Sequence, residues 1–332
     1  MTNSSERVNP TYPVYEPGTL WQRIVDRTQS ALACGALQSI ATTYEIVDQA
    51  GIPFLVRVLA NLDRKTAAKK EQDRKSRLGV EFNPFLPYEP ALYVADLSPT
   101  HICLLNKFNV VDHHILLITR EFEEQDALLT RPDFAAASQV LAELDGLIFY
   151  NGGKLAGSSQ RHKHLQWLPL PMLPNNIRLP IEPLVTTAQT IDGIATIPSL
   201  PFIHYISKFD TAKFDTAKFD TAKCDAFPSS DPMSELYLDR YLKLLKAANV
   251  SDAINCDRSQ HGAYNLLLTR HWMMLIPRSQ ESFAGISVNS LGFAGALLVR
   301  NSDQLHQLKT LTPLTLLTEV GYAHNSHNLG TI

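Results

Sequence analysis

Two histidines and a glutamine alternate in the stretch Gly157-Ser158-Ser159-Gln160-Arg161-His162-Lys163-His164-Leu165-Gln166. In a β-strand, side chains two residues apart share one face, so His162, His164 and Gln166 would point together. Lys163 and the residues that alternate with the triplet would point to the opposite face. The stretch therefore predicts a strand with one face for chemistry and one face for packing.

The triplet is uncommon in a chain of this composition. With 11 histidines in 332 residues, a chance His-x-His pair is expected about 0.4 times, and a glutamine two residues further lowers this to about 0.015. The Gly-Ser-Ser lead-in adds to the pattern. Glycine lets the backbone approach a ligand closely, and hydroxyl and amide groups donate to phosphate oxygens. The stretch thus indicates transfer of a phosphorus-bound group.

Each member of the triplet has an expected role. Neutral imidazole is a nucleophile near pH 7, so His164, central in the triplet, is the predicted nucleophile. We expect His162 to fix the loop by a hydrogen bond, and Gln166 to donate its amide to a non-bridging oxygen. A backbone carbonyl that accepts from the other ring nitrogen of His164 would set its tautomer, but the sequence does not identify that carbonyl.

Two other interpretations of the histidines are open. A His-x-His pair on a strand can bind zinc, with His113 and His114 as further ligands, yet the four cysteines show no Cys-x-x-Cys spacing. The pair could also be simply buried or solvated, which leaves the Gly-Ser-Ser-Gln lead-in unexplained. We therefore expect no metal site and favour the chemical interpretation.

Composition and charge predict a globular protein that does not bind nucleic acid. The chain has 30 basic and 33 acidic residues and a formal net charge of -3, which provides no general surface for polyanions. No apolar run approaches the length of a membrane span, and the first residues lack a hydrophobic signal segment. Together with four scattered cysteines, these features predict a cytoplasmic protein without a membrane partner.

Hydrophobic periodicity predicts both helices and strands along the chain. Helices are expected over about 20–50, tempered by Gly35, and over 133–146 and 232–248. Strands are expected over 52–59, 92–95, 101–105, 115–119, 264–269 and 272–277, and residues 292–299 fit either structure. Strands that return late in the chain predict an α+β fold, with a mainly antiparallel sheet flanked by helices.

Two segments have unusual composition. Residues 63–77 are mostly basic, which is typical of solvated surface, although Lys65 could reach a polyphosphate. Residues 208–223 hold three copies of Lys-Phe-Asp-Thr-Ala, whose period fits neither helix nor strand, so we expect an expanded surface loop. We expect an N-terminal catalytic portion over 1–205, this inserted loop over 206–230, and a C-terminal portion over 231–332 that completes the substrate site.

Four motifs together resemble the diadenosine tetraphosphate phosphorylases, which are ATP adenylyltransferases of the histidine triad superfamily. The motifs are Asn106–Val111, Tyr150–Gly153, Gly157–Gln166 and Tyr264–Arg278, so the resemblance spans roughly residues 50 to 300. The His-Lys-His-Leu-Gln form separates the chain from the related galactose-1-phosphate uridylyltransferases, which typically have proline between the histidines. The resemblance implies a histidine-triad-like (HIT-like) fold.

The resemblance also implies a reaction and its participants. Diadenosine tetraphosphate and phosphate would give ATP and ADP, reversibly, through an adenylylated His164, so the expected partners are these small molecules. No cofactor is required in this class, and a divalent cation such as Mg²⁺ is left open as an assistant. The family's substrate-binding residues fall on Lys65, Asn106, Lys107, Asn151, Gly157, Ser158, Ser159, Gln160, Thr269, Arg270 and His271, beside the catalytic His162, His164 and Gln166.

The chain departs from the family pattern at several positions, and two other functions are alternative hypotheses. The family often has Lys-Glu at Arg270-His271 and a lysine at Gln280, and the pentapeptide insertion is foreign to it. A related uridylyl or adenylyl-sulfate transferase would use the same histidine, because the motif recognises the α-phosphate rather than the base. A dinucleotide sensor that does not cleave its ligand is a third hypothesis, against which the intact nucleophile argues. Base specificity, phosphate versus sulfate as acceptor, metal requirement and oligomeric state are not decided by the sequence.

Overall fold

The computed structural model describes residues 15–60, 83–173, 176–210, 231–250 and 262–324. Ten of the described strands form one sheet in the order β3-β4-β5-β7-β6-β11-β12-β10-β9-β8, and neighbouring strands are antiparallel. In chain order they are β3 (Tyr93–Asp96), β4 (His101–Leu105), β5 (Ile115–Thr119), β6 (Gly146–Gly152), β7 (His164–Pro169), β8 (Gln189–Ile191), β9 (Ile194–Thr196), β10 (Tyr205–Lys208), β11 (Tyr264–Leu268) and β12 (Trp272–Pro277). The predicted α+β fold with a mainly antiparallel sheet is confirmed, and the five strands expected within this sheet agree to within about a residue.

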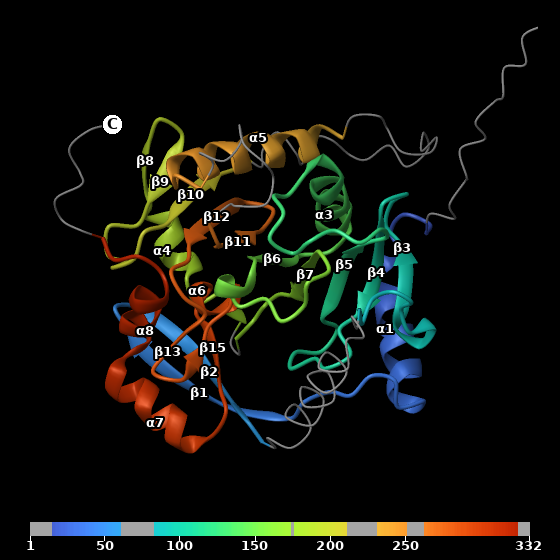
Figure 1. Ribbon diagram of the computed structural model, residues 1–332, viewed down its shortest axis with the longest axis horizontal. Coiled ribbons are helices and arrows are strands. Elements are labelled where there is room, and N and C mark those ends of the chain that lie inside the picture. Colours follow the sequence, from blue (N-terminus) through green and yellow to red (C-terminus); the bar gives the residue numbers. More distant parts are fainter. Residues whose placement is uncertain (1–14, 61–82, 174–175, 211–230, 251–261, 325–332) are drawn as a thin grey trace, which may run out of the picture.

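Three helices cover one face of this sheet: α1 (Leu20–Ala33), α3 (Arg131–Glu143) and α5 (Pro232–Ala247). Their apolar side chains, among them Ile24, Phe134 and Tyr241, join those of the strands in one buried cluster. In Figure 1, α3 and α5 lie above the sheet and α1 lies at its right-hand end. The start of α5 is fixed locally, because the Asp231 carboxylate accepts from two backbone N–H groups of the first turn.

A smaller sheet and a second cluster lie on the opposite face. This sheet has the order β1-β2-β15, in which β1 (Thr42–Gln49) is antiparallel and β15 (Ala296–Val299) parallel to β2 (Ile52–Leu59). With α7 and α8 it occupies the lower left of Figure 1. The remaining elements are η1 (Pro90–Leu92), η2 (Lys154–Ala156), α4 (Glu182–Thr186), β13 (Ser282–Phe283), β14 (Ile286–Ser287), α6 (Ser290–Phe293), α7 (Ser302–Leu311) and α8 (Pro313–Val320).

The helix expected over 20–50 is wrong beyond residue 33. α1 ends at Ala33, Gly35 takes a left-handed conformation with φ +78°, and residues 42–49 pair with β2 along their whole length. The β-branched residues of Thr42–Gln49 favour a strand once a partner is available. The ambiguous segment 292–299 contains both structures, since the end of α6 and β15 are joined by Gly295 at φ +94°.

Strands from the two halves of the chain form two blocks in the large sheet, β3 to β7 and β8 to β12, which meet where β6 pairs with β11. The repeat segment begins at Lys208, the last residue of β10, and the ring of Phe209 is buried 5.2 Å from that of Tyr237. The expected surface loop is therefore wrong for the first residues of the first copy, and residues 211–230 lie outside the described residues. The division into three portions stays a prediction.

None of the helices in the described ranges is long and apolar enough to cross a membrane.

Candidate active site

The two faces of β7 differ as the alternation predicts. His164 faces Phe85, whose ring centroid is 5.3 Å from that of His164, whereas Leu165 belongs to the cluster beneath α3. His162 precedes the strand, which begins at His164, and forms an isolated antiparallel bridge with Glu124. The Phe85 ring nevertheless lies 5.7 Å from that of His162, so both imidazoles are on the same side.

The tautomer of His164 is set by a backbone carbonyl two residues earlier. Nδ1 lies 2.8 Å from the carbonyl oxygen of His162, and because a carbonyl can only accept, Nδ1 carries the proton and Nε2 the lone pair. Burial lowers the pKa of His164 to about 4, partly opposed by this hydrogen bond, so the ring is neutral near pH 7. The carbonyl that the sequence did not identify is thus that of His162. The arrangement is that of a nitrogen nucleophile.

His162 connects three segments around the nucleophile. Its Nε2 donates to the carbonyl oxygen of Thr119 at 2.8 Å, at the end of β5. Its Nδ1 accepts from Nδ2 of Asn83 at 3.0 Å, while Oδ1 of Asn83 accepts from the backbone N–H of Phe85. Burial lowers the pKa of His162, which keeps this ring neutral as well. His162 therefore holds the loop before β7 against β5 and the segment that carries Phe85.

A third imidazole orients Gln166. Nε2 of His114 lies 3.1 Å from Oε1 of Gln166, and Nδ1 of His114 lies 3.1 Å from Nδ2 of Asn106. Since Nδ2 of Asn106 can only donate, Nδ1 accepts and Nε2 donates to the Gln166 oxygen. The amide nitrogen of Gln166 is then left to donate elsewhere. Sequence reasoning gave His114 no role at the site beyond that of a conceivable zinc ligand, and it placed Asn106 against substrate rather than against this ring.

The segment Gly157–Gln160 lies between η2 and the start of β7. Gly157 takes φ +87°, and a Cβ there would come within 2.6 Å of the carbonyl oxygen of Val288, so a side chain does not fit. Ser158 donates its backbone N–H to the carbonyl of Gly153 and its hydroxyl to that of Gln160. Ser159 is exposed. The turn that results has the tight backbone expected of a phosphate-binding loop.

Buried polar groups hold the base of this loop. Nδ2 of Asn265 donates to Oδ1 of Asn151 at 3.0 Å and to the carbonyl oxygen of Ala156 at 2.9 Å. The Ala156 carbonyl also accepts from the buried guanidinium of Arg278 at 3.3 Å. Oδ1 of Asn151 accepts further from the N–H of Ser290 at 2.9 Å. Asn151 is thus fixed beside the loop, and sequence reasoning did not find the supports Asn265 and Arg278.

Other predicted substrate contacts lie elsewhere. Nζ of Lys107 forms a salt bridge with Glu89 at 2.7 Å, and Lys65 lies outside the described residues. Thr269, Arg270 and His271 follow the end of β11 that pairs with Ile148, whereas Asn265 pairs with Asn151 near the opposite end. Arg270 donates there to the carbonyls of Leu141 and Ala142 at the end of α3. The structure therefore does not bring these three residues to His164.

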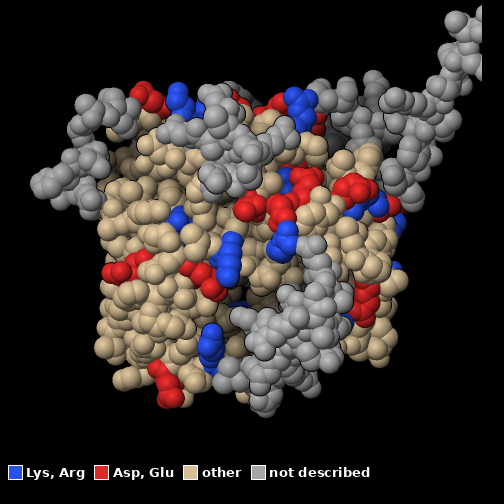
Figure 2. Space-filling model, viewed as in Figure 1, with Lys and Arg blue, Asp and Glu red and all other residues tan. Residues whose placement is uncertain are grey.

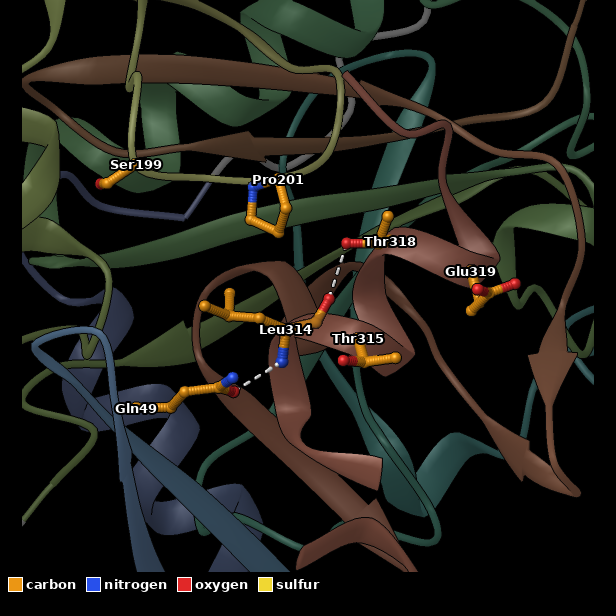
Figure 3. A pocket seen from close by; sticks show the side chains of 7 residues that line it. All are labelled: Gln49, Ser199, Pro201, Leu314, Thr315, Thr318 and Glu319. Carbon is orange, nitrogen blue, oxygen red and sulfur yellow. Dashed lines mark hydrogen bonds between the residues drawn. The ribbon is translucent and has the colours of Figure 1, made fainter. Parts of the chain in front are cut away.

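One hollow on the described surface lies away from the histidines. It is an open hollow of about 380 Å³, lined by Gln49, Ser199, Pro201, Leu314, Thr315, Thr318 and Glu319, which Figure 3 shows. None of the predicted site residues lines it. Over the parts of the chain that the structure describes, no three His, Cys, Asp or Glu side chains gather in a way that could hold a metal ion. On the face seen in Figure 2, the basic and acidic side chains drawn in colour are interspersed.

Comparison with known families identifies the family of the chain. Residues 10–187 match the Ap4A phosphorylase N-terminal domain, and residues 198–323 match the ATP adenylyltransferase C-terminal domain. The chain belongs to the Ap4A phosphorylase family. β8 and β9 lie between the two matched regions, and each region contributes further strands to the large sheet.

Relatives from Saccharomyces cerevisiae align with nearly the whole chain. Protein APA1 is 29% identical and covers 93% of this chain and 96% of its own. Diadenosine 5',5'''-P1,P4-tetraphosphate phosphorylase 2 is 29% identical and covers 87% of this chain and 90% of its own. The crystal structure of yeast Ap4A phosphorylase Apa2 superposes with a TM-score of 0.72 at 23% identity, over 95% of this chain and 97% of that one. The fold of this family member is therefore that of Apa2.

Proposed function

We propose that the protein cleaves diadenosine tetraphosphate by phosphorolysis, giving ATP and ADP reversibly through an adenylylated His164. The observation that carries the proposal is the fixed tautomer of a buried, neutral His164, whose Nδ1 is committed to the carbonyl oxygen of His162. Such a ring presents Nε2 as a nucleophile without a separate base. Membership of the Ap4A phosphorylase family supplies the substrate, and yeast Apa2 was crystallised in complex with Ap4A.

The reaction divides into two displacements at one phosphorus atom. Nε2 of His164 attacks the phosphorus that bears one adenosine, the bond to the bridging oxygen breaks, and ATP leaves with the bonding electrons. An oxygen of inorganic phosphate then attacks the same phosphorus, the N–P bond breaks, and ADP leaves as the imidazole returns to its neutral form. The Gln166 amide, held through its oxygen by His114, donates to a non-bridging oxygen during both steps.

We further infer that Mg²⁺ assists as a ligand of the substrate polyphosphate and that the exposed hydroxyl of Ser159 and backbone groups of the Gly157–Gln160 loop bind the phosphates. Activity measured with excess EDTA, and again after Mg²⁺ is restored, tests the first inference. Ser159→Ala tests the second, with a rise in KM for diadenosine tetraphosphate as the expected result. The expected compartment stays the cytoplasm, which imaging of the tagged chain would test.

The proposed function is tested by incubating the protein with diadenosine tetraphosphate and phosphate and resolving the nucleotides by chromatography. ATP and ADP in equal amounts are expected. Turnover of a nucleotide sugar or of adenylyl sulfate in place of diadenosine tetraphosphate would support the related transferases instead. Binding of the dinucleotide without products would support a sensor.

The nucleophile is tested by His164→Asn, which we expect to lower kcat by about a thousandfold or more while the protein stays folded. Mass spectrometry after brief exposure to substrate without phosphate should find AMP on the peptide that carries His164 in the unsubstituted protein and not in the variant. His204→Asn provides a comparison, because His204 is another buried imidazole, bonded to Phe202 and Ile197 away from this strand. Activity that survives His164→Asn would contradict the assignment.

A further inference from the structure

The pairing between β6 and β7 stops before it reaches the nucleophile His164. The antiparallel ladder between β6 and β7 ends at the pair Phe149 and Gln166. Continued by two residues, the same register would place Asn151 opposite His164. The backbone groups of these two residues would then require partners, because unpaired N–H and C=O groups in a buried strand are costly.

One side chain occupies this gap. Nε2 of Gln125 donates to the carbonyl oxygen of Asn151 at 3.0 Å and to that of His164 at 3.2 Å. Oε1 of Gln125 accepts from the backbone N–H of His164 at 2.9 Å. An amide side chain carries both a donor and an acceptor, so it reproduces the bonding of a neighbouring peptide group. Gln125 therefore satisfies both backbone groups of the nucleophilic residue.

The amide of Gln125 has little freedom to leave this position. Gln125 is 3% exposed, and its backbone N–H donates to the carbonyl oxygen of Arg161 at 2.7 Å. Its carbonyl oxygen accepts from the hydroxyl of Tyr150, on β6. The residue is thus anchored both to the segment before β7 and to the neighbouring strand.

We propose that Gln125 is the positioning residue that fixes the backbone of His164, standing in for the missing part of the β6–β7 ladder. This inference rests on the proposed role of His164 as nucleophile. Holding the N–H and C=O of one residue fixes its Cα, and the Nδ1 bond to the carbonyl of His162 then fixes the ring. Reaction rates depend steeply on such placement, since a shift of about 1 Å can cost about 100-fold.

Two substitutions separate this role from simple space filling. Gln125→Glu keeps the shape, but an ionised carboxylate cannot donate to the two carbonyl oxygens. Gln125→Met keeps the volume and removes every polar atom. We expect kcat for phosphorolysis of diadenosine tetraphosphate to fall about 100-fold in Gln125→Met, with KM changed less than about threefold.

The Glu variant adds a signature in its pH profile. A protonated carboxyl at position 125 still donates one hydrogen bond, and burial favours the protonated form. We therefore expect kcat of Gln125→Glu, relative to that of the unsubstituted protein, to recover as the pH is lowered through the ionisation of the new carboxyl. A role limited to filling space would give a constant ratio of the two rates.

Gln49 supplies the matched control. Its amide makes the same kind of clamp, donating to Oγ1 of Thr312 at 2.9 Å and accepting from the backbone N–H of Leu314 at 2.8 Å. Figure 3 shows the Leu314 bond at the hollow away from the histidines. We expect Gln49→Glu and Gln49→Met to lower the melting temperature without changing kcat.

The outcomes are distinct. If the unsubstituted protein gives no ATP and ADP, the proposed function fails before the variants are compared. If it is active, and a folded Gln125→Met or Gln125→Glu keeps kcat within about threefold of it at every pH, the positioning role is overturned. A matching loss of kcat in the Gln49 variants would overturn it as well. Should Gln125→Met not fold, the pH profile of Gln125→Glu decides between the same two results.

Discussion

The orientation of a single amide depends on His114. An unrestrained glutamine could present either its oxygen or its nitrogen to a phosphate, and the oxygen would repel it. His114 removes this choice, because its Nε2 donates to Oε1 of Gln166 and its Nδ1 is occupied by Asn106. Burial lowers the pKa of His114 to about 3, so the ring does not gain a second proton near neutral pH. Its bonding pattern is therefore constant where the reaction runs.

We expect His114→Asn to lower kcat about tenfold or more, because the shorter side chain reproduces the position of Nδ1 but not that of Nε2. Steady-state kinetics with diadenosine tetraphosphate measure the effect. His113→Asn is the matched control, since the neighbouring ring instead lies 5.0 Å from that of Trp21 and 3.3 Å from the Thr28 hydroxyl. Equal rates in the two variants would show that His114 does not act through Gln166.

The sequence predicts site residues that lie close together along the chain and misses those that are far apart along it. His162, His164 and Gln166 were found because strand geometry relates positions two apart. His114 contacts Gln166 across 52 positions, and Gln125 contacts His164 across 39. These separations reflect which strands become neighbours, and no periodicity within one segment carries that information.

At the scale of elements, the residue directly before β7 is joined to the start of α3 by a buried ion pair. Nζ of Lys163 lies 2.7 Å from Oδ2 of Asp133, and both side chains are almost fully buried. Burial would raise the pKa of Asp133, but the hydrogen bond from His101 and the charge of Lys163 outweigh it, so the pKa lies below its usual range. The Asp133 carboxylate also accepts from the N–H of Thr130 at 2.6 Å, which caps α3.

We expect Lys163→Met to lower the free energy of unfolding by about 3 to 5 kcal/mol, because it leaves the Asp133 carboxylate buried without its cation. Urea denaturation measures the change. Lys243→Met is the control, since Lys243 pairs with Asp239 on the surface at 2.8 Å and should contribute less than about 1 kcal/mol. The double variant Lys163→Met/Asp133→Asn should be more stable than Lys163→Met alone. The opposite order would contradict a pairing role.

Elements were predicted best where one pattern continued without interruption. The apolar strands Ile115–Thr119 and Trp272–Pro277 are buried throughout, and continuous apolar runs mark such strands. The resemblance placed Thr269, Arg270 and His271 at the substrate site, but in the structure they follow the end of β11 that lies away from Asn151. The exposed strand β1 was missed because its side chains are mostly solvated, so burial leaves no alternation in its sequence.

At the scale of the whole molecule, the three described imidazoles whose pKa burial lowers most lie in different parts of the fold. His114 and His164 lie at the site, and His204 lies directly before β10, where Nδ1 donates to the carbonyl of Phe202 and Nε2 accepts from the N–H of Ile197. Burial lowers the pKa of His204 to about 4, close to that of His164, and that of His114 to about 3. All three rings are neutral in the folded protein and gain a proton readily only when it unfolds.

The stability of the fold should consequently fall as the solution is acidified. An exposed histidine in the unfolded chain titrates near about pH 6.5, so below that pH the unfolded state binds more protons, and each ring lowers the free energy of unfolding by up to about 1.4 kcal/mol per pH unit. The loss begins near pH 6.5 and continues to the folded values of about 4 for His164 and His204. Urea denaturation at pH 7.5, 6.5 and 5.5 measures it, and His204→Gln should reduce the slope relative to the unsubstituted protein. A free energy of unfolding that stays constant over this range would mean that the three rings are not held neutral, and with them the neutral nucleophile would be lost.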